Sequence, residues 1–269
     1  MKRKRSTDVY SDSMLFTTSW DDGYKLDLRV AELLERYGAT GTFYVCPRKQ
    51  HDAQMLSREE IVELSARHEI GAHTLRHPRL TALPPLEAMQ EIEDSKAWVE
   101  DITGTECRMF CYPYGDYNPA IQELVRKAGF MGARTVEQLR FNAEDPFALP
   151  TTLHVTPFPR RKSWSRWWHP LDPFGPLRVR YKRLRELKVR TGCLRSWSDL
   201  AACLFEYASA LPSSSHFHLW GHSREIEKYG MWEEFERFLQ YVANTGGVEY
   251  GKNSELPVVR ANPVVGSSL

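Results

Sequence analysis

The sequence has almost no excess of charge of either sign. Its 36 lysines and arginines are balanced by 35 acidic residues, for a formal net charge of +1. This balance excludes a globally basic nucleic-acid coat and a globally acidic tail. The apolar runs fall far short of the roughly 20 residues that a membrane-spanning helix needs. With 26% charged residues and ordinary glycine and proline contents, disordered and collagen-like chains are excluded as well.

Cysteine is also scarce. Five cysteines are an odd number, unlike the even set of a small secreted disulfide scaffold. The N-terminus is basic, but the polar residues 9–13 follow where a signal peptide would have its apolar stretch. We therefore predict a disordered basic tail over residues 1–13 and a cytoplasmic location.

The remaining chain alternates strand and helix signals. Such alternation predicts βαβ units around a parallel sheet, and seven strands favour a distorted (β/α) barrel, closed or incomplete. The predicted barrel covers residues 14–256, with an insertion at 157–196 and a C-terminal tail at 257–269. The predicted strands are 15–20, 40–45, 69–72, 107–112, 131–134, 152–155 and 216–220, and the predicted helices 26–37, 57–67, 85–102, 119–128, 198–210 and 231–242.

The insertion is basic and aromatic. Residues 160–190 carry eleven lysines and arginines and two acids, interleaved with Trp164, Trp167, Trp168 and Phe174. Three interpretations stay open. The segment is a solvated lid, a clamp for an anionic substrate, or a patch that contacts a membrane surface.

Polar residues follow four of the predicted strands. Asp21 and Asp22 come after the first, His73 and His77 after the third, the turn 113–115 after the fourth, and His222 after the last. Because reactive groups of parallel barrels gather where strands end, we expect these residues to meet at one rim.

His73 and His77 have metal-ligand spacing. Two imidazoles four residues apart, placed on one face of a helical turn, can bind one divalent ion. A carboxylate from the Asp21–Asp22 pair would complete a set of two histidines and one carboxylate, typical of catalytic zinc. The other carboxylate would then be free to reach the attacking water.

Four motifs resemble the signatures of the polysaccharide deacetylases, the NodB-like carbohydrate esterases. They occur in the family's order and together span most of the chain. The motifs are Ser19-Trp20-Asp21-Asp22-Gly23, Gly71-Ala72-His73-Thr74-Leu75-Arg76-His77, Phe110-Cys111-Tyr112-Pro113-Tyr114-Gly115 and His218-Leu219-Trp220-Gly221-His222-Ser223.

The resemblance implies a barrel with fewer than eight strands, a divalent metal that is usually zinc (cobalt and nickel stay open), and hydrolysis of N-acetyl groups on amino sugars. It assigns Asp21 as catalytic base and His222 as general acid. It implies Asp22, His73 and His77 as metal ligands, and the backbone N–H of Tyr114, in the turn begun by Pro113, as an oxyanion donor.

The chain departs from the family pattern at two points. Cys111 stands where the family often has an arginine that orients the catalytic aspartate, and Arg134 at the end of the next strand is our candidate replacement. The carboxylate that partners the acid histidine is not identifiable, with Glu144 and Asp145 as positional candidates.

We therefore predict a metal-dependent N-deacetylase acting on a glycan or glycoconjugate that contains N-acetylhexosamine. The alternatives are a hydrolase of a small cyclic amide and a catalytically silent sugar-binding module. A nucleic-acid partner is not expected, because a basic segment without a binding motif is weak evidence.

Overall fold

The computed structural model describes residues 13–47, 54–162, 167–211 and 215–256. The two predicted tails lie outside these residues, except for Ser13. Trp164 of the predicted insertion lies outside them as well. The strands are β1 (Met14–Asp22), β2 (Thr42–Val45), β3 (Glu69–Ala72), β4 (Met109–Cys111), β5 (Gly132–Arg134), β6 (Leu153–His154), β7 (His216–Gly221) and β8 (Val248–Gly251). The α-helices are α1 (Asp27–Arg36), α2 (Arg58–Ser65), α3 (Pro85–Thr103), α4 (Pro119–Lys127), α5 (Gly175–Glu186), α6 (Trp197–Ser209), α7 (Ser223–Tyr229) and α8 (Trp232–Ala243).

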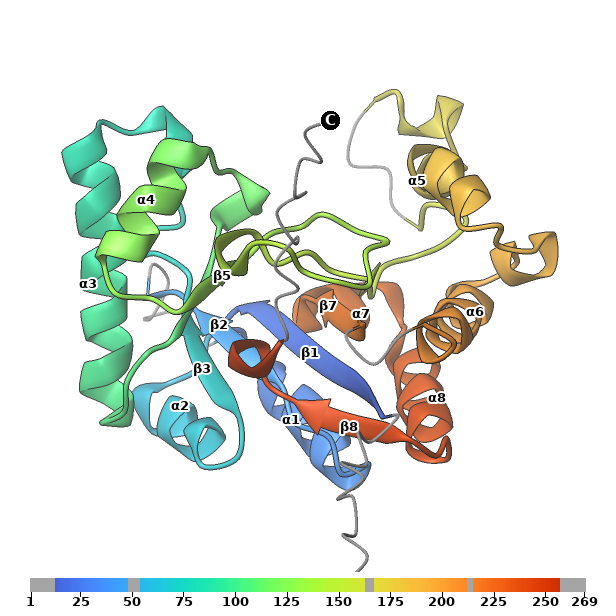
Figure 1. Ribbon diagram of the computed structural model, residues 1–269, viewed down its shortest axis with the longest axis horizontal. Helices are drawn as coiled ribbons and strands as arrows, with labels where there is room; N and C mark the ends of the chain where they lie inside the picture. Colours follow the sequence, from blue (N-terminus) through green and yellow to red (C-terminus); the bar gives the residue numbers. More distant parts are fainter. Residues whose placement is uncertain (1–12, 48–53, 163–166, 212–214, 257–269) are drawn as a thin grey trace, which may run out of the picture.

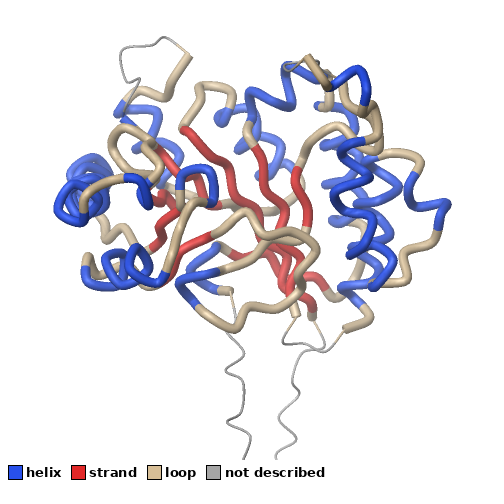
Figure 2. Tube along the Cα trace, turned by 90° about the horizontal axis from the view of Figure 1, so that it is seen from above, coloured by secondary structure: helices blue, strands red, loops and turns tan. Residues whose placement is uncertain are grey.

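The strands form one parallel sheet in the order β5-β4-β3-β2-β1-β7-β6. In Figure 1, helices α2, α3 and α4 lie to the left of the curled sheet, and α6 and α8 lie to its right; Figure 2 shows the same sheet from above. This arrangement is the predicted distorted barrel with seven parallel strands. An eighth strand, β8, adds to the first half of β1 beyond this path.

A short segment narrows the opening between the outer strands β5 and β6. Leu149 bridges Arg134 of β5 in parallel register, and its backbone N–H donates to the carbonyl oxygen of Ala133. Four residues later the chain enters β6, which pairs with β7. The rim of the barrel is therefore nearly continuous although the sheet is open.

Alternation along the strands separates two environments. Phe16, Phe43 and Phe217 belong to the large apolar core, which includes the buried faces of the helices. The side chains on the opposite face of β1 and β7 are polar. The buried ring of His218 lies 2.6 Å from Thr17 Oγ1 and 2.9 Å from Ser19 Oγ. This polar row leads toward the carboxyl ends of the strands.

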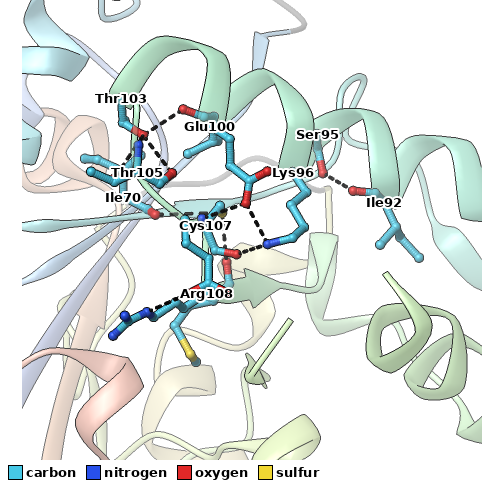
Figure 3. A network of polar contacts seen from close by, with 12 residues as sticks. Ile70, Ile92, Ser95, Lys96, Glu100, Thr103, Thr105, Cys107 and Arg108 are labelled. Carbon is cyan, nitrogen blue, oxygen red and sulfur yellow. Dashed lines mark hydrogen bonds and ion pairs between the residues drawn. The ribbon is translucent and has the colours of Figure 1, made fainter. Parts of the chain in front are cut away.

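A polar network joins α3 to the entry of β4 (Figure 3). Lys96 Nζ donates to Glu100 Oε1 at 2.8 Å and to the carbonyl oxygen of Cys107 at 2.6 Å. The backbone N–H of Cys107 donates to the same Glu100 oxygen at 3.0 Å. These bonds fix the start of β4, the strand that carries Cys111 and leads to the turn at Pro113.

Helices α2 and α4 each begin at a side-chain cap. The capping box of α2 forms between Ser57 and Glu60, and Asn118 Oδ1 accepts from the backbone N–H of Ile121 at the start of α4. Three elements were not predicted as such: α7, β8, and α5 within the insertion. In the described part of the chain, no helix is long and apolar enough to cross a membrane.

Cys193 and Cys203 form a disulfide that links the residues before α6 to α6 itself. Our expectation from the odd cysteine count did not include this bond. Cys46, Cys107 and Cys111 are buried and are not part of this disulfide.

Candidate active site

The carboxyl ends of the strands surround one cleft of about 410 Å³. Every residue predicted to be catalytic or metal-binding lines this cleft: Asp21, Asp22, His73, His77 and His222. Tyr114 lines it as well, whereas the side chains of Arg134 and Pro113 are buried behind the lining. The other lining residues are Tyr112, Val136, Gln138, His154 and Trp220.

Asp22, His73 and His77 converge on one point. Asp22 Oδ1 lies 3.7 Å from His73 Nε2 and 3.4 Å from His77 Nε2, and the three candidate ligand atoms lie within 4.8 Å of one another. The predicted helical turn is wrong, however. Residues 73–77 form an irregular loop in which Thr74 and His77 have positive φ, so backbone bending and not helical periodicity brings the rings together.

These three side chains fit a divalent metal. His73 Nδ1 lies 2.8 Å from the carbonyl oxygen of Cys111. Since a carbonyl oxygen only accepts, Nδ1 carries the hydrogen and the lone pair of Nε2 points to the cleft. Two imidazole nitrogens and one carboxylate oxygen are the donor set of catalytic zinc sites.

The loop between the two histidines is held by Glu91 of α3. Its buried carboxylate accepts from the backbone N–H groups of Leu75 and Arg76, both at 2.9 Å, and pairs with the Arg76 side chain. The left-handed backbone at His77 is thereby fixed by bonds from a separate element.

Asp21 is buried and paired with Arg134. The Arg134 guanidinium is fully buried and donates to Asp21 Oδ1. Burial alone would raise the pKa of Asp21, but Arg134, with smaller contributions from His73 and His222, lowers this pKa to about 2. The carboxyl group is therefore ionised at neutral pH.

Cys111 and Arg134 are paired neighbours in the β4–β5 register. Cys111 Sγ lies 3.7 Å from Asp21 Oδ2, and burial raises the pKa of this thiol well above its usual value, so it stays neutral. The cation next to Asp21 thus comes from the adjacent strand, at the same level of the sheet. The structure places Arg134 against Asp21, and its role in orienting this carboxylate stays a prediction.

Backbone strain concentrates around the cleft. Six residues other than glycine have positive φ in the described chain, and four of them are Asp22, Thr74, His77 and Tyr114. Each such conformation costs on the order of 1–3 kcal/mol and is typical of functional sites. Tyr114 follows the buried Pro113, its ring packs edge-on against His77, and the Arg79 guanidinium lies over its face.

His222 is tied to a carboxylate that sequence reasoning missed. His222 Nδ1 lies 3.6 Å from Glu225 Oε2, and the same oxygen lies 3.2 Å from His154 Nε2. Burial would lower the pKa of His222, but Glu225, Asp21 and Asp22 raise it to about 9. The His222 ring is therefore positively charged at neutral pH.

The positional candidates Glu144 and Asp145 do not fill this role. Both line a different pocket, and Asp145 caps the short turn that begins at Pro146. Glu225 was identifiable in principle, because it lies three residues after His222 at a helix start. His154 carried no such signal, since it lies 68 residues before His222 in the sequence and reaches the cleft only through the pairing of β6 with β7.

Residues 11–133 match the family model described as polysaccharide deacetylase. These residues make up just under half of the chain, and over this part the chain is similar to the polysaccharide deacetylases. Over 99 residues the chain is 29% identical to peptidoglycan-N-acetylmuramic acid deacetylase PdaC of Bacillus subtilis (strain 168). That match covers 36% of this chain and only 20% of the length of PdaC.

Solved structures support the predicted fold. The structure of peptidoglycan deacetylase PdaC from Bacillus subtilis aligns with a TM-score of 0.54 at 16% identity, covering 92% of each chain. A family 4 acetyl xylan esterase from Clostridium thermocellum, solved with a cobalt ion, gives a TM-score of 0.55 at 16% identity, covering 90% of this chain and 89% of that one. At these identities the similarity establishes the fold.

Proposed function

We propose that this protein is a metal-dependent N-deacetylase that releases acetate from a glycan or glycoconjugate containing N-acetylhexosamine. One observation carries the proposal. An ionised buried carboxylate (Asp21), a three-ligand set (Asp22, His73, His77) and a protonated imidazole (His222) line the same cleft.

Amide hydrolysis needs help at two atoms. The carbonyl carbon is a poor electrophile, and the amine nitrogen is a poor leaving group until it is protonated. A divalent ion bound by Asp22, His73 and His77 would polarise the carbonyl and lower the pKa of a water to about 7. Zinc is our first choice for this donor set, with cobalt and nickel as alternatives.

The chain's own residues supply the proton transfers. Asp21, ionised and held in orientation by Arg134, accepts a proton from the attacking water. The backbone N–H of Tyr114 stabilises the developing oxyanion, a contact whose loss typically costs roughly 10²–10³ in rate. His222, kept protonated by Glu225, donates its proton to the departing nitrogen.

Acetate release tests the proposal against the cyclic-amide alternative. The enzyme is incubated with N-acetylglucosamine oligomers and, separately, with a ureide, each with and without a chelator. We expect acetate from the oligomers, abolished by the chelator and restored by added metal. Ring opening of the ureide without acetate release would overturn the proposal, as would acetate release that a chelator leaves unchanged.

The predicted cytoplasmic location stays a prediction. The disulfide between Cys193 and Cys203 is evidence against it, because such bonds persist mainly in oxidising compartments. The expectation that no nucleic acid is bound also stays a prediction. Contact of residues 160–190 with an anionic substrate stays a prediction as well.

A further inference from the structure

Helix α5 of the insertion has an inner face that packs on the barrel. Leu184 and Leu187 are buried in the main core. Arg180 Nε donates to Gln138 Oε1 at 3.0 Å, and Gln138 lines the catalytic cleft. Tyr181 does not belong to this inner face, because its ring is exposed.

The outer surface of the insertion is unusually apolar for an exposed region. Trp167 is 86% exposed, Leu171 78% and Val179 67%. With Phe174 and Tyr181, five of the twelve large exposed apolar side chains of the described chain fall between residues 167 and 181. Clustered exposed apolar side chains mark interaction sites, whereas single ones are ordinary.

The same segment is strongly cationic. Its two acids are neutralised within the segment, Asp172 by Arg161 and Arg178, and Glu186 by Arg183. In the described residues no carboxylate lies within ion-pair distance of three other cations of this segment, Lys182, Arg185 and Lys188. Arg178, Lys182 and Arg185 recur at helical spacing and form an exposed stripe along α5.

We propose that this surface, defined by Trp167, Leu171, Val179, Tyr181, Arg178, Lys182, Arg185 and Lys188, docks on an anionic lipid bilayer. Cations near an anionic leaflet contribute about 1 kcal/mol each. Electrostatic attraction alone would suit a nucleic acid or an acidic glycan equally well. The exposed Trp167, Leu171 and Val179 favour the bilayer, because apolar side chains among cations insert at the headgroup level.

Docking would place the catalytic cleft beside the bilayer. The link is α5 itself, whose inner face bonds to Gln138 of the cleft wall while its outer stripe carries the cations. The proposal concerns binding only, so it stands or falls independently of the deacetylase activity.

Vesicle co-sedimentation of the full chain tests the proposal. Vesicles of phosphatidylcholine alone are compared with vesicles containing roughly a third phosphatidylglycerol, at low and high salt. We expect binding to the anionic vesicles at low salt, weakened but not abolished at high salt, and no binding to phosphatidylcholine. No binding to anionic vesicles at low salt would overturn the proposal.

Two variants separate the contributions. Lys182→Glu with Arg185→Glu should weaken vesicle binding roughly 30-fold or more, from about 1 kcal/mol for each cation removed. Leu171→Ser should weaken it several-fold. The matched controls on the opposite side of the molecule, Arg126→Glu with Lys127→Glu on α4 and Leu86→Ser on α3, should leave binding unchanged.

Thermal melting of each variant establishes that it is folded. Vesicle binding that falls equally in the α4 charge controls would contradict this location of the surface. Binding to dextran sulfate as strong as to vesicles, with Leu171→Ser neutral in both assays, would assign the surface to a polyanion instead of a bilayer.

Discussion

The buried ion pair between Asp21 and Arg134 sets the charge at the centre of the cleft. A buried carboxylate costs free energy unless a partner compensates it. Arg134 supplies that compensation. It lies on β5 beside Cys111 of β4, the position at which the family often has an arginine. Asp21 therefore remains ionised without exposure to bulk water.

Replacing Arg134 with methionine should destabilise the protein by about 3–5 kcal/mol, because it leaves a buried charge without a partner. In the parent, the lowered pKa of Asp21 contributes stability above pH 3.8 that is lost as pH falls through about 2. In the variant, burial raises this pKa, so the sign reverses and stability is lost as pH rises. Urea unfolding at pH 4.5 and pH 8 should show the larger difference between variant and parent at pH 8.

The double variant Asp21→Asn, Arg134→Met is the control. It removes both charges, so its stability relative to the parent should vary much less between the two pH values. An Arg134→Met variant that retains full turnover would show that Arg134 does not orient the catalytic base.

Glu225 should set the alkaline limit of activity. His222 acts as an acid, so turnover should fall as pH rises through its pKa, which the neighbouring carboxylates raise. Glu225→Gln removes the carboxylate that raises this pKa, and the alkaline limb of the pH–rate profile should move to lower pH. Glu227→Gln, an exposed neighbour paired with Arg29, is the control and should leave the limb in place. An unmoved limb in Glu225→Gln would contradict the role of this pair.

The main cleft residues could be predicted from the sequence because the candidate catalytic and metal-binding side chains lie at the carboxyl ends of strands. Asp21 lies near the end of β1, and His73 and His222 directly follow β3 and β7. Glu225 and His154 were missed for different reasons: the first is close in sequence but looks like an ordinary helix-start acid, and the second reaches the cleft only through strand pairing.

At the scale of elements, local sequence signals were enough to predict most strands, whereas structure that depends on tertiary contacts was missed. Strands β1 to β7 were predictable from apolar β-rich runs. Strand β8 was not, because it is four residues long, half exposed and ends in glycine. The loop at residues 73–77 was mistaken for a helical turn, since spacing alone cannot reveal the bonds from Glu91 that bend it.

The capping box of α2 provides a test of a local signal. Ser57→Ala removes the side-chain oxygen that accepts from the backbone N–H of Glu60, and should destabilise the protein by about 1 kcal/mol. For a chain of this size this corresponds to a melting temperature lower by about 2–4 °C. Ser57→Thr keeps the hydroxyl and should lower the melting temperature less. Equal losses in both variants would argue against a capping role.

At the scale of the whole molecule, the ligand set joins elements that are distant in sequence. Asp22 ends β1, and His73 and His77 lie after β3, so an ion bound between them would cross-link the rim. Zinc at 100 times its dissociation constant should stabilise the fold by about 2.7 kcal/mol, raising the melting temperature by about 5–10 °C. His77→Ala should lose this increase. The same zinc-induced increase in His77→Ala would place the ion elsewhere.

The most direct test of the central claim is the metal content of purified variants, measured together with acetate release. Asp21→Asn should keep one divalent ion per chain while turnover falls by roughly 10²–10⁴, because only the base is removed. Asp22→Ala should lose both the ion and turnover. Full turnover in Asp21→Asn, or an undiminished metal content in Asp22→Ala, would contradict the division of roles between these adjacent carboxylates.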